Sequence, residues 1–261
     1  MNDITILNSR ERRENVLFLA EAWKSKGSTR SYSPIEDDAG QGESFALFKD
    51  LCFHILATQP APPAVFEADW RRFMDAGTIY AIYDDSFEIK RYAMDPPVLR
   101  QDSKGKVIDF IRVATAIPTL ERLLPQPTDS DVTADVLYAI SGGALKSRAF
   151  AVVGDMLRAG RWTDPALYRF SFTADGRLRK RTVRMGLTDL PEKADTFADM
   201  KAFNRAIHAI VKMSLGDDLQ YLHTDLFMKT IPIIRCEICD AARMASCPLP
   251  HCRWRREHIE P

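Results

Sequence analysis

The chain has 261 residues, equal numbers of acidic and basic side chains, and 46% hydrophobic residues. This length fits one large domain or two small ones, and the apolar content excludes a disordered protein. A net charge of zero excludes a uniformly basic nucleic-acid coat protein but allows a local basic face. No apolar run is long enough to span a membrane, and no basic region precedes an apolar block at the N-terminus. We therefore expect a cytoplasmic protein without a secretory signal.

Helical periodicity is present in nearly every segment of the chain. In chain order, helices are expected at 14–24, 45–58, 64–76, 78–93, 103–115, 133–140, 146–159, 198–215 and 218–229. Residues 25–43 are rich in Ser, Gly, Asp and Pro and are predicted to form a loop. Residues 170–178 alternate around Asp175-Gly176, which is typical of a small β-hairpin. The expected fold class is all-α, with a β-hairpin insertion at 171–190.

Lys146 and Asp164 are the pair of residues most indicative of chemistry. Lys146 follows the glycine-rich turn 141–145 and opens an expected helix. Asp164 precedes Pro165, and this pair is a favourable helix start because aspartate caps and proline suits the first helical position. An amine and a carboxylate in one cleft can act as nucleophile and as electrostatic partner. Alternatively, Asp164 is only a helix cap, and Lys146, if it faces solvent, is only a phosphate contact.

Four of the five cysteines cluster near the C-terminus with the spacing Cys-x2-Cys-x7-Cys-x4-Cys. They are Cys236, Cys239, Cys247 and Cys252. A cytosolic chain rarely uses clustered cysteines for disulfides, and this spacing is typical of metal ligands. Four thiolates suit either tetrahedral zinc or a [4Fe–4S] cluster. The fifth, Cys52, lies in the apolar run 48–56 and is expected to be a core residue.

A short basic stretch at 177–184 carries five cations in eight residues. It is either a solvated strand or hairpin, or a surface that neutralises phosphates and gains affinity by releasing counterions. On the second interpretation the candidate DNA contacts are Arg177, Arg179, Lys180 and Arg181.

Taken in chain order, these features resemble the helix-hairpin-helix DNA glycosylases of the endonuclease III type. The run Ile55-Leu56-Ala57-Thr58-Gln59 looks like the family helix that ends in leucine-small-small-glutamine. The run Gly142-Gly143-Ala144-Leu145-Lys146 falls on the family's hairpin and catalytic lysine, and the interval to Asp164 aligns without a gap. The cysteines follow where the family has its iron–sulfur loop. The resemblance covers roughly residues 44–255.

The resemblance implies a DNA base-excision glycosylase with associated AP-lyase activity. Lys146 would be the nucleophile, Asp164 would stabilise developing positive charge, and Gln59 would fill the gap left by an everted nucleotide. The backbone of the hairpin would hold phosphate through Gly142, Gly143 and Ala144. The expected partner is double-stranded DNA with a damaged or modified base. We expect the protein to act as a monomer that associates with the nucleoid and not with a membrane. The expected cofactor is a [4Fe–4S] cluster, with Zn²⁺ as the alternative.

Two departures from the family pattern keep other functions open. Ala144 stands where the family usually has a second hairpin glycine, and the family's cysteine spacing is Cys-x6-Cys-x2-Cys-x5-Cys. The alternatives are a catalytically silent helical DNA-binding protein with a zinc-stabilised tail, and a related scaffold that acts on modified bases or nucleotides. The expected organisation is an N-terminal helix and loop (1–43) that pack on the C-terminal lobe, a helical barrel with the hairpin (44–165), and a C-terminal helical lobe with the four-cysteine loop (166–261).

Overall fold

The computed structural model describes most of the chain. The described residues are 6–25, 42–58, 63–84, 106–123, 130–170, 172–193, 195–216, 226–227, 230 and 233–258. Helices dominate these residues, and no strand occurs among them, which confirms the all-α fold class. None of the helices described here is both long and apolar enough to cross a membrane.

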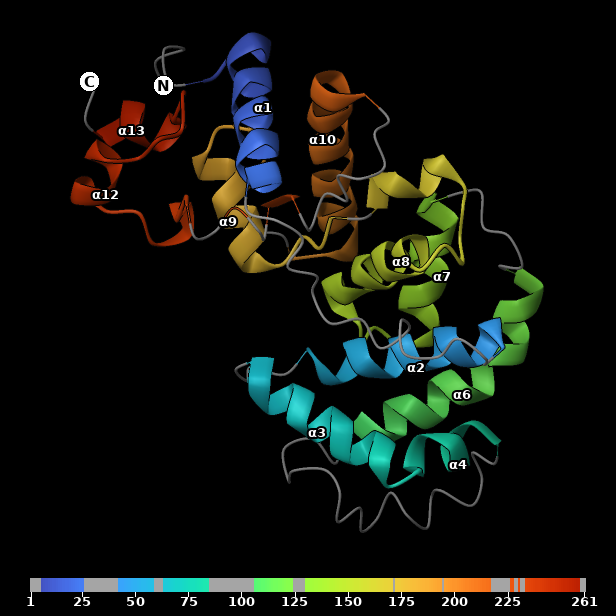
Figure 1. The fold of residues 1–261 in the computed structure, drawn as a ribbon. Helices are drawn as coiled ribbons and strands as arrows, with labels where there is room; N and C mark the ends of the chain where they lie inside the picture. Colours follow the sequence, from blue (N-terminus) through green and yellow to red (C-terminus); the bar gives the residue numbers. More distant parts are fainter. Residues whose placement is uncertain are drawn as a thin grey trace. The chain divides into compact units, whose positions relative to one another are not determined.

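The chain divides into two compact units, which Figure 1 shows as ribbons. Unit 1 comprises residues 1–31 and 168–261, and unit 2 comprises residues 32–167. The helices of unit 1 are α1 (Ser9–Ser25), α9 (Gly176–Arg184), α10 (Phe197–Leu215), η5 (Cys236–Ile238), α12 (Ala241–Ala245) and α13 (Arg253–His258). Those of unit 2 are α2 (Glu43–Leu56), α3 (Pro63–Asp75), α4 (Thr78–Asp84), α6 (Lys106–Leu123), α7 (Ser130–Ile140), η3 (Lys146–Arg148) and α8 (Ala149–Arg158). The short helix η4 (Pro165–Phe170) lies at the boundary.

Helix α2 is the centre of unit 2. It packs against α6 and α8, and its residues from 45 to 57 are almost all buried. Aromatic rings continue this core: Phe53 meets Trp70 of α3 at 5.4 Å between ring centroids, and Phe73 meets Phe110 of α6 at the same separation. Each buried aromatic side chain removes a large apolar area from water, so these contacts are a major stabilising contribution to unit 2.

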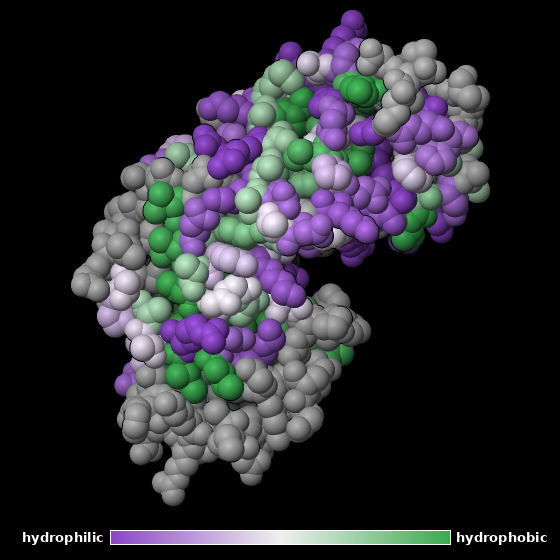
Figure 2. All heavy atoms as spheres, turned by 180° about the vertical axis from the view of Figure 1, so that it is seen from behind, coloured by the Kyte–Doolittle hydropathy of each residue, from purple (hydrophilic) through white to green (hydrophobic). Residues whose placement is uncertain are grey.

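Unit 1 is built around the pairing of α1 with α10, so the N-terminal helix packs on C-terminal residues. Val16 and Leu19 of α1 share a buried cluster with Ile207 and Val211 of α10. A capping box starts α10, because the Thr196 side chain accepts from the Asp199 N–H and Asp199 accepts in return. In Figure 2, hydrophilic side chains cover most of the visible face of unit 1, with small apolar patches between them.

The predicted β-hairpin at 171–190 is wrong, because residues 176–184 form helix α9. Asp175 caps this helix and accepts a hydrogen bond of 2.8 Å from the Leu178 N–H. The Asp-Gly pair that suggested a hairpin turn is therefore an N-cap followed by the first helical residue. Leu178, Thr182 and Val183 form the buried face of this helix, at helical rather than alternating spacing.

The other helices lie close to their expected positions. The helix expected at 45–58 begins two residues earlier, with Gly42 rather than Ser44 at the cap, and ends at Leu56. The helix expected at 103–115 is observed as α6 and extends to Leu123, with Pro118 inside it. The expected helical segments 85–93, 103–105 and 218–225 lie outside the described residues.

Candidate functional site

The turn between α7 and η3 has the geometry that its glycines predict. Gly142 and Gly143 both have positive φ, at +59° and +79°. The N–H groups of these two residues donate to Ala139 O and Tyr138 O, at 2.9 and 3.0 Å. These bonds satisfy carbonyls at the C-terminal end of α7 and turn the chain toward η3. Gly142 is exposed, while Gly143 and Ala144 are half-buried.

Arg112 of α6 fastens this turn to the rest of unit 2. Its guanidinium donates to Ser141 O at 3.1 Å and to the Asp109 carboxylate at 2.9 Å. Ser141 is buried, and its hydroxyl accepts from the Leu145 N–H at 3.3 Å. The turn is therefore anchored on both sides by side-chain hydrogen bonds.

Gly142→Ala is expected to destabilise unit 2 more than Gly160→Ala. Both glycines have positive φ, which costs a residue with a Cβ about 1–2 kcal/mol. At Gly142 the added Cβ would also overlap the Arg112 guanidinium, whereas at Gly160 it meets nothing within 4 Å. Thermal unfolding of the two variants measures the difference, and equal losses of stability would show that Arg112 does not restrain the turn.

Lys146 lies immediately after this turn, at the start of η3. Its side chain is exposed, and it is the one non-glycine residue of the described chain with positive φ, at +49°. A lysine in the left-handed region is uncommon and persists only where the surrounding structure holds it. The chain continues through η3 directly into α8, so the amine extends from the N-terminal end of this helical run.

Asp164 lies beyond the other end of α8, just before η4. Its half-buried carboxylate accepts a hydrogen bond of 2.8 Å from the Ala166 N–H, so it does act as a helix cap. The loop between α8 and Asp164 turns back on the helix, because the N–H groups of Arg161 and Trp162 both donate to Met156 O. Lys146 and Asp164 belong to the same unit, but no ion pair joins these two described residues.

The other sequence-predicted DNA contacts have different outcomes. Arg181 is fully buried and donates to Ile234 O and Thr230 Oγ1, so its prediction as a phosphate contact is wrong. Arg179 is partly buried and donates to Ala174 O and Glu192 O. Arg177 is exposed and Lys180 is half-buried. Gln59 lies outside the described residues.

The four clustered cysteines surround one cavity of unit 1. The cavity has a volume of ≈ 150 Å³ and is lined by all four thiols, by Trp254 and by three arginines, Arg184, Arg235 and Arg243. Cys236 opens η5, Cys239 follows it, Cys247 follows α12 and Cys252 precedes α13. None of the cysteines in the described chain forms a disulfide. Three short helices thus bring residues that span 17 positions of sequence to one point.

The thiols lie close enough to influence one another. Burial raises the pKa of the Cys236 thiol, Arg181 opposes this rise, and each of the other three thiols adds to it. The same electrostatic coupling joins the remaining pairs, Cys239 with Cys247 and Cys252, and Cys252 with Cys247. All four cysteines therefore face a common centre.

The two candidate metal groups require different sulfur separations. A tetrahedral zinc ion with bonds of about 2.3 Å requires sulfur atoms about 3.8 Å apart. A [4Fe–4S] cluster binds each thiolate through a different iron at a separate corner, so its sulfur ligands lie farther apart. Among these four cysteines, all described, no three sulfur atoms lie within 4.8 Å of one another. The four thiols around the cavity could hold either group after adjustment of their side chains.

Arginines hold the backbone of the cysteine loop. Arg184 donates to Cys236 O at 3.1 Å and stacks over the Trp254 ring at 4.1 Å. Arg243 donates to Ile238 O at 2.7 Å, and the Arg255 N–H donates to the Cys252 sulfur at 3.4 Å. These positive charges offset the net negative charge that four thiolates and a metal group would carry.

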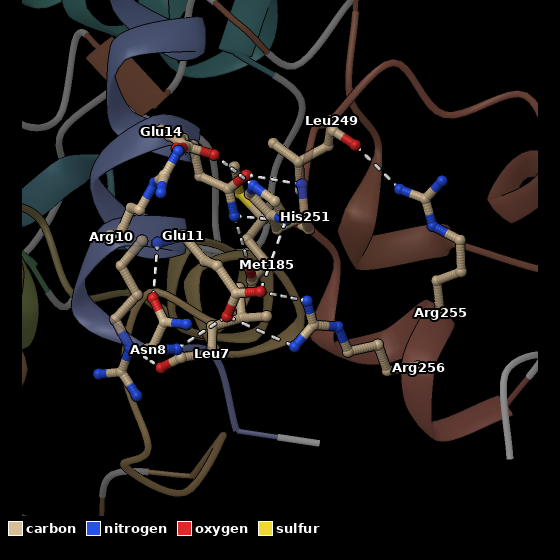
Figure 3. Close-up of polar contacts among 12 residues, drawn as sticks. Leu7, Asn8, Arg10, Glu11, Glu14, Met185, Leu249, His251, Arg255 and Arg256 are labelled. Atoms are coloured by element: carbon tan, nitrogen blue, oxygen red, sulfur yellow. Dashed lines mark hydrogen bonds and ion pairs between the residues drawn. The ribbon is translucent and has the colours of Figure 1, made fainter. Parts of the chain in front are cut away.

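Helix α1 also contacts the cysteine loop, and Figure 3 shows the contacts of Glu14 with His251 and of Glu11 with Arg256. Asn15 is buried and donates to Met185 O at 3.1 Å and to His251 O at 2.7 Å, while its side-chain oxygen accepts from the His251 N–H at 3.0 Å. The segment that carries Cys252 is therefore fixed by the N-terminal helix.

A second polar cluster, in unit 2, was not predicted from the sequence. It consists of Asp50 and His54 of α2 and Asp155 of α8, all three buried. The available signal was an aspartate and a histidine four positions apart in a mostly apolar helix, which also carries Lys49. Asp155, which lies 101 positions after His54, gave no such signal.

Comparisons with known proteins leave the family open. No protein-family model, no curated protein and no solved structure matches this chain.

Proposed function

We propose that the protein is a DNA base-excision glycosylase with associated AP-lyase activity. The observation that carries the proposal is the position of Lys146, a lysine held at positive φ three residues after the left-handed pair Gly142 and Gly143, where the turn from α7 enters η3. Its side chain faces solvent, which suits a phosphate contact as well as a nucleophile. Asp164, in the same unit, starts the next short helix. Double-stranded DNA with a damaged or modified base is the proposed substrate, and the protein acts as a monomer.

The proposed reaction starts with a nucleotide rotated out of the duplex. The amine nitrogen of Lys146 attacks C1′ of the deoxyribose, and the bond to the base breaks as the base leaves with a proton. The half-buried carboxylate of Asp164 stabilises the positive charge that develops on the sugar. Ring opening gives an imine between the Lys146 nitrogen and C1′, and elimination of the 3′ phosphate then cleaves the strand. The N–H groups of Gly142, Gly143 and Ala144 already donate to carbonyls of α7 and the turn, so a phosphate held at this turn would be contacted by side chains instead.

The four cysteines have a structural role in this proposal. A [4Fe–4S] cluster held by the four thiols around the cavity would cross-link the C-terminal loop and thereby stabilise unit 1. Arg177 and Lys180 of α9 remain the candidates for phosphate contact in the basic stretch, while Arg181 holds the loop that precedes Cys236.

A panel of duplexes, each with one damaged or modified base, tests the proposal. The expected result is release of at least one kind of base, followed by strand cleavage at the resulting abasic site. Base release and nicking are scored separately, because a glycosylase without lyase activity gives only the first. Salt-sensitive binding to every duplex without release of any base would contradict the proposal.

One observation favours a second function, a non-catalytic DNA-binding protein. Asp164 already has a structural role as the cap that accepts from the Ala166 N–H, and it forms no ion pair with Lys146 within the described chain. On this reading the hairpin would contact only phosphates, and the cysteine loop would hold structural zinc. Asp164→Asn would then leave DNA affinity almost unchanged.

A further inference from the structure

The buried polar cluster of unit 2 combines residues from two packed helices. Asp50 and His54 lie one turn apart on α2, and α8, which packs against α2, contributes Asp155. The three residues are 0%, 4% and 7% exposed. Ionisable side chains are rarely buried to this extent unless they are paired or bind a metal ion.

The ligand-type atoms of these residues converge on one point. The His54 Nε2 atom lies 2.9 Å from Asp155 Oδ2 and 3.6 Å from Asp50 Oδ1. One ligand atom from each residue can be chosen so that all three lie within 4.8 Å of one another. An ion with bonds of about 2.0–2.2 Å to nitrogen and oxygen needs ligand atoms about 3–3.5 Å apart. The two measured distances bracket that requirement.

Asp50 lacks the partners that a buried carboxylate requires. No N–H group donates to either of its oxygens, and the Nδ1 atom of His54 has no partner. The one side-chain hydrogen bond of Asp50 is with the Asp155 carboxyl, and it requires a proton held between the two acids. A buried carboxylate without a partner costs several kcal/mol in desolvation, so such groups are normally hydrogen-bonded or bind cations. Since Asp50 Oδ1 faces His54 and Asp155, the unsatisfied oxygen points toward the centre of the cluster.

Charges of both signs surround this centre. Arg158 and Lys49 lie near Asp50, and Arg148 and Arg158 lie near His54, so the two carboxylates are the groups that would attract a cation. Arg158 binds the other oxygen of Asp155 and thereby directs Oδ2 toward His54.

We propose that Asp50, His54 and Asp155 bind a divalent first-row transition metal ion, separately from the cysteine site. One imidazole and two carboxylates suit Mn²⁺, Fe²⁺, Co²⁺ or Zn²⁺, whereas Ca²⁺ and Mg²⁺ prefer oxygen ligands alone. Two carboxylates balance the charge of such an ion. The ion would join α2 to α8, the helix that follows Lys146, and so stiffen the support of the hairpin.

Cobalt titration of the full-length protein tests this site. The protein is first dialysed against a chelator, and Co²⁺ is then added with visible and near-ultraviolet absorption recorded. The four cysteines can also bind Co²⁺ and then give thiolate charge-transfer absorption. We therefore expect one further equivalent of Co²⁺ to add ligand-field bands without more charge-transfer absorption, because nitrogen and oxygen ligands lack it. Asp50→Asn should weaken this binding more than about 100-fold, since it removes a charged ligand. Asp109→Asn, the same change at a partly exposed position of unit 2, should leave it unchanged.

Folding of the variants is checked by their unfolding temperatures. Asparagine has the size of aspartate and no charge to bury, so Asp50→Asn should unfold at or above the temperature of the metal-free wild type, and added Co²⁺ should no longer raise it. His54→Gln provides a second ligand deletion. Spectra with only thiolate charge-transfer bands would overturn the proposal, as would unchanged binding in both variants. If the wild type gave no cobalt signal, the proposal would also be overturned, and His54 and Asp155 would be only a buried hydrogen-bonded pair.

Discussion

Lys146→Ala is expected to abolish covalent trapping of the protein on DNA that contains an abasic site. Borohydride reduces an imine to a stable amine, and without the Lys146 nitrogen no imine can form at this site. We expect strand cleavage to fall by at least about a thousand-fold, because the residue supplies the nucleophile rather than only binding energy. Trapped complexes are counted on denaturing gels with a labelled duplex.

Two further variants separate the nucleophile from a phosphate contact. Lys146→Arg retains the positive charge but should also fail to trap, since a guanidinium does not form the imine. Asp164→Asn should lose base release and yet still be trapped on a preformed abasic site, and its cap to the Ala166 N–H should survive. Trapping that persists in Lys146→Ala would assign the reaction to another amine and refute the proposed nucleophile.

Loss of the metal group is the second large expected effect. Cys236→Ser should remove most of the iron or zinc bound by the protein and lower the unfolding free energy of unit 1 by more than about 3 kcal/mol, because metal binding at such loops is coupled to folding. Cys236 is almost fully buried, so no water can replace the missing ligand without rearrangement. Metal and inorganic sulfide are measured on the purified protein, and stability is measured by urea unfolding.

Cys52→Ala is the matched control for this experiment. Cys52 is fully buried in α2 of unit 2, whereas the four-cysteine cavity belongs to unit 1, so its removal should leave metal and sulfide content unchanged. Cys52→Ala should lower the stability of unit 2 only by the cost of a small cavity in its core. Sulfide together with iron would support the cluster, whereas one zinc without sulfide would contradict it. Full metal content in Cys236→Ser would remove the assignment of this loop as a metal site.

Local signals in the sequence were sufficient for most of the helices. Apolar residues at helical spacing predicted α2, α3 and α10 to within two or three residues. The Asp175-Gly176 pair led to the wrong prediction of a β-hairpin, because the same dipeptide occurs in hairpin turns and at helix N-caps. Burial decided between them: Leu178 and Val183 lie in the core of unit 1 and require helical spacing. That core includes α1 and α10, which are distant in sequence.

The difference between local sequence signals and long-range packing also explains which site residues could be predicted. The cysteine loop could be predicted because all four ligand positions lie within one short segment. The burial of Arg181 could not be predicted from the sequence, because its partners Thr230 and Ile234 lie about 50 residues later. The cluster of His54 with Asp155 depends on the packing of α2 against α8, and helical periodicity identifies the buried face of each helix without identifying its neighbour.

The bond between Asn15 and His251 has a consequence for synthesis of the protein. Its two ends are 236 positions apart, and every residue of unit 2 lies between them. During synthesis all of unit 2 therefore emerges from the ribosome before α10 and the cysteine loop do. Unit 2 can fold at a stage when α1 has no helix to pack against. During that interval Val16 and Leu19 stay uncovered, which makes the nascent N-terminal helix a target for chaperones.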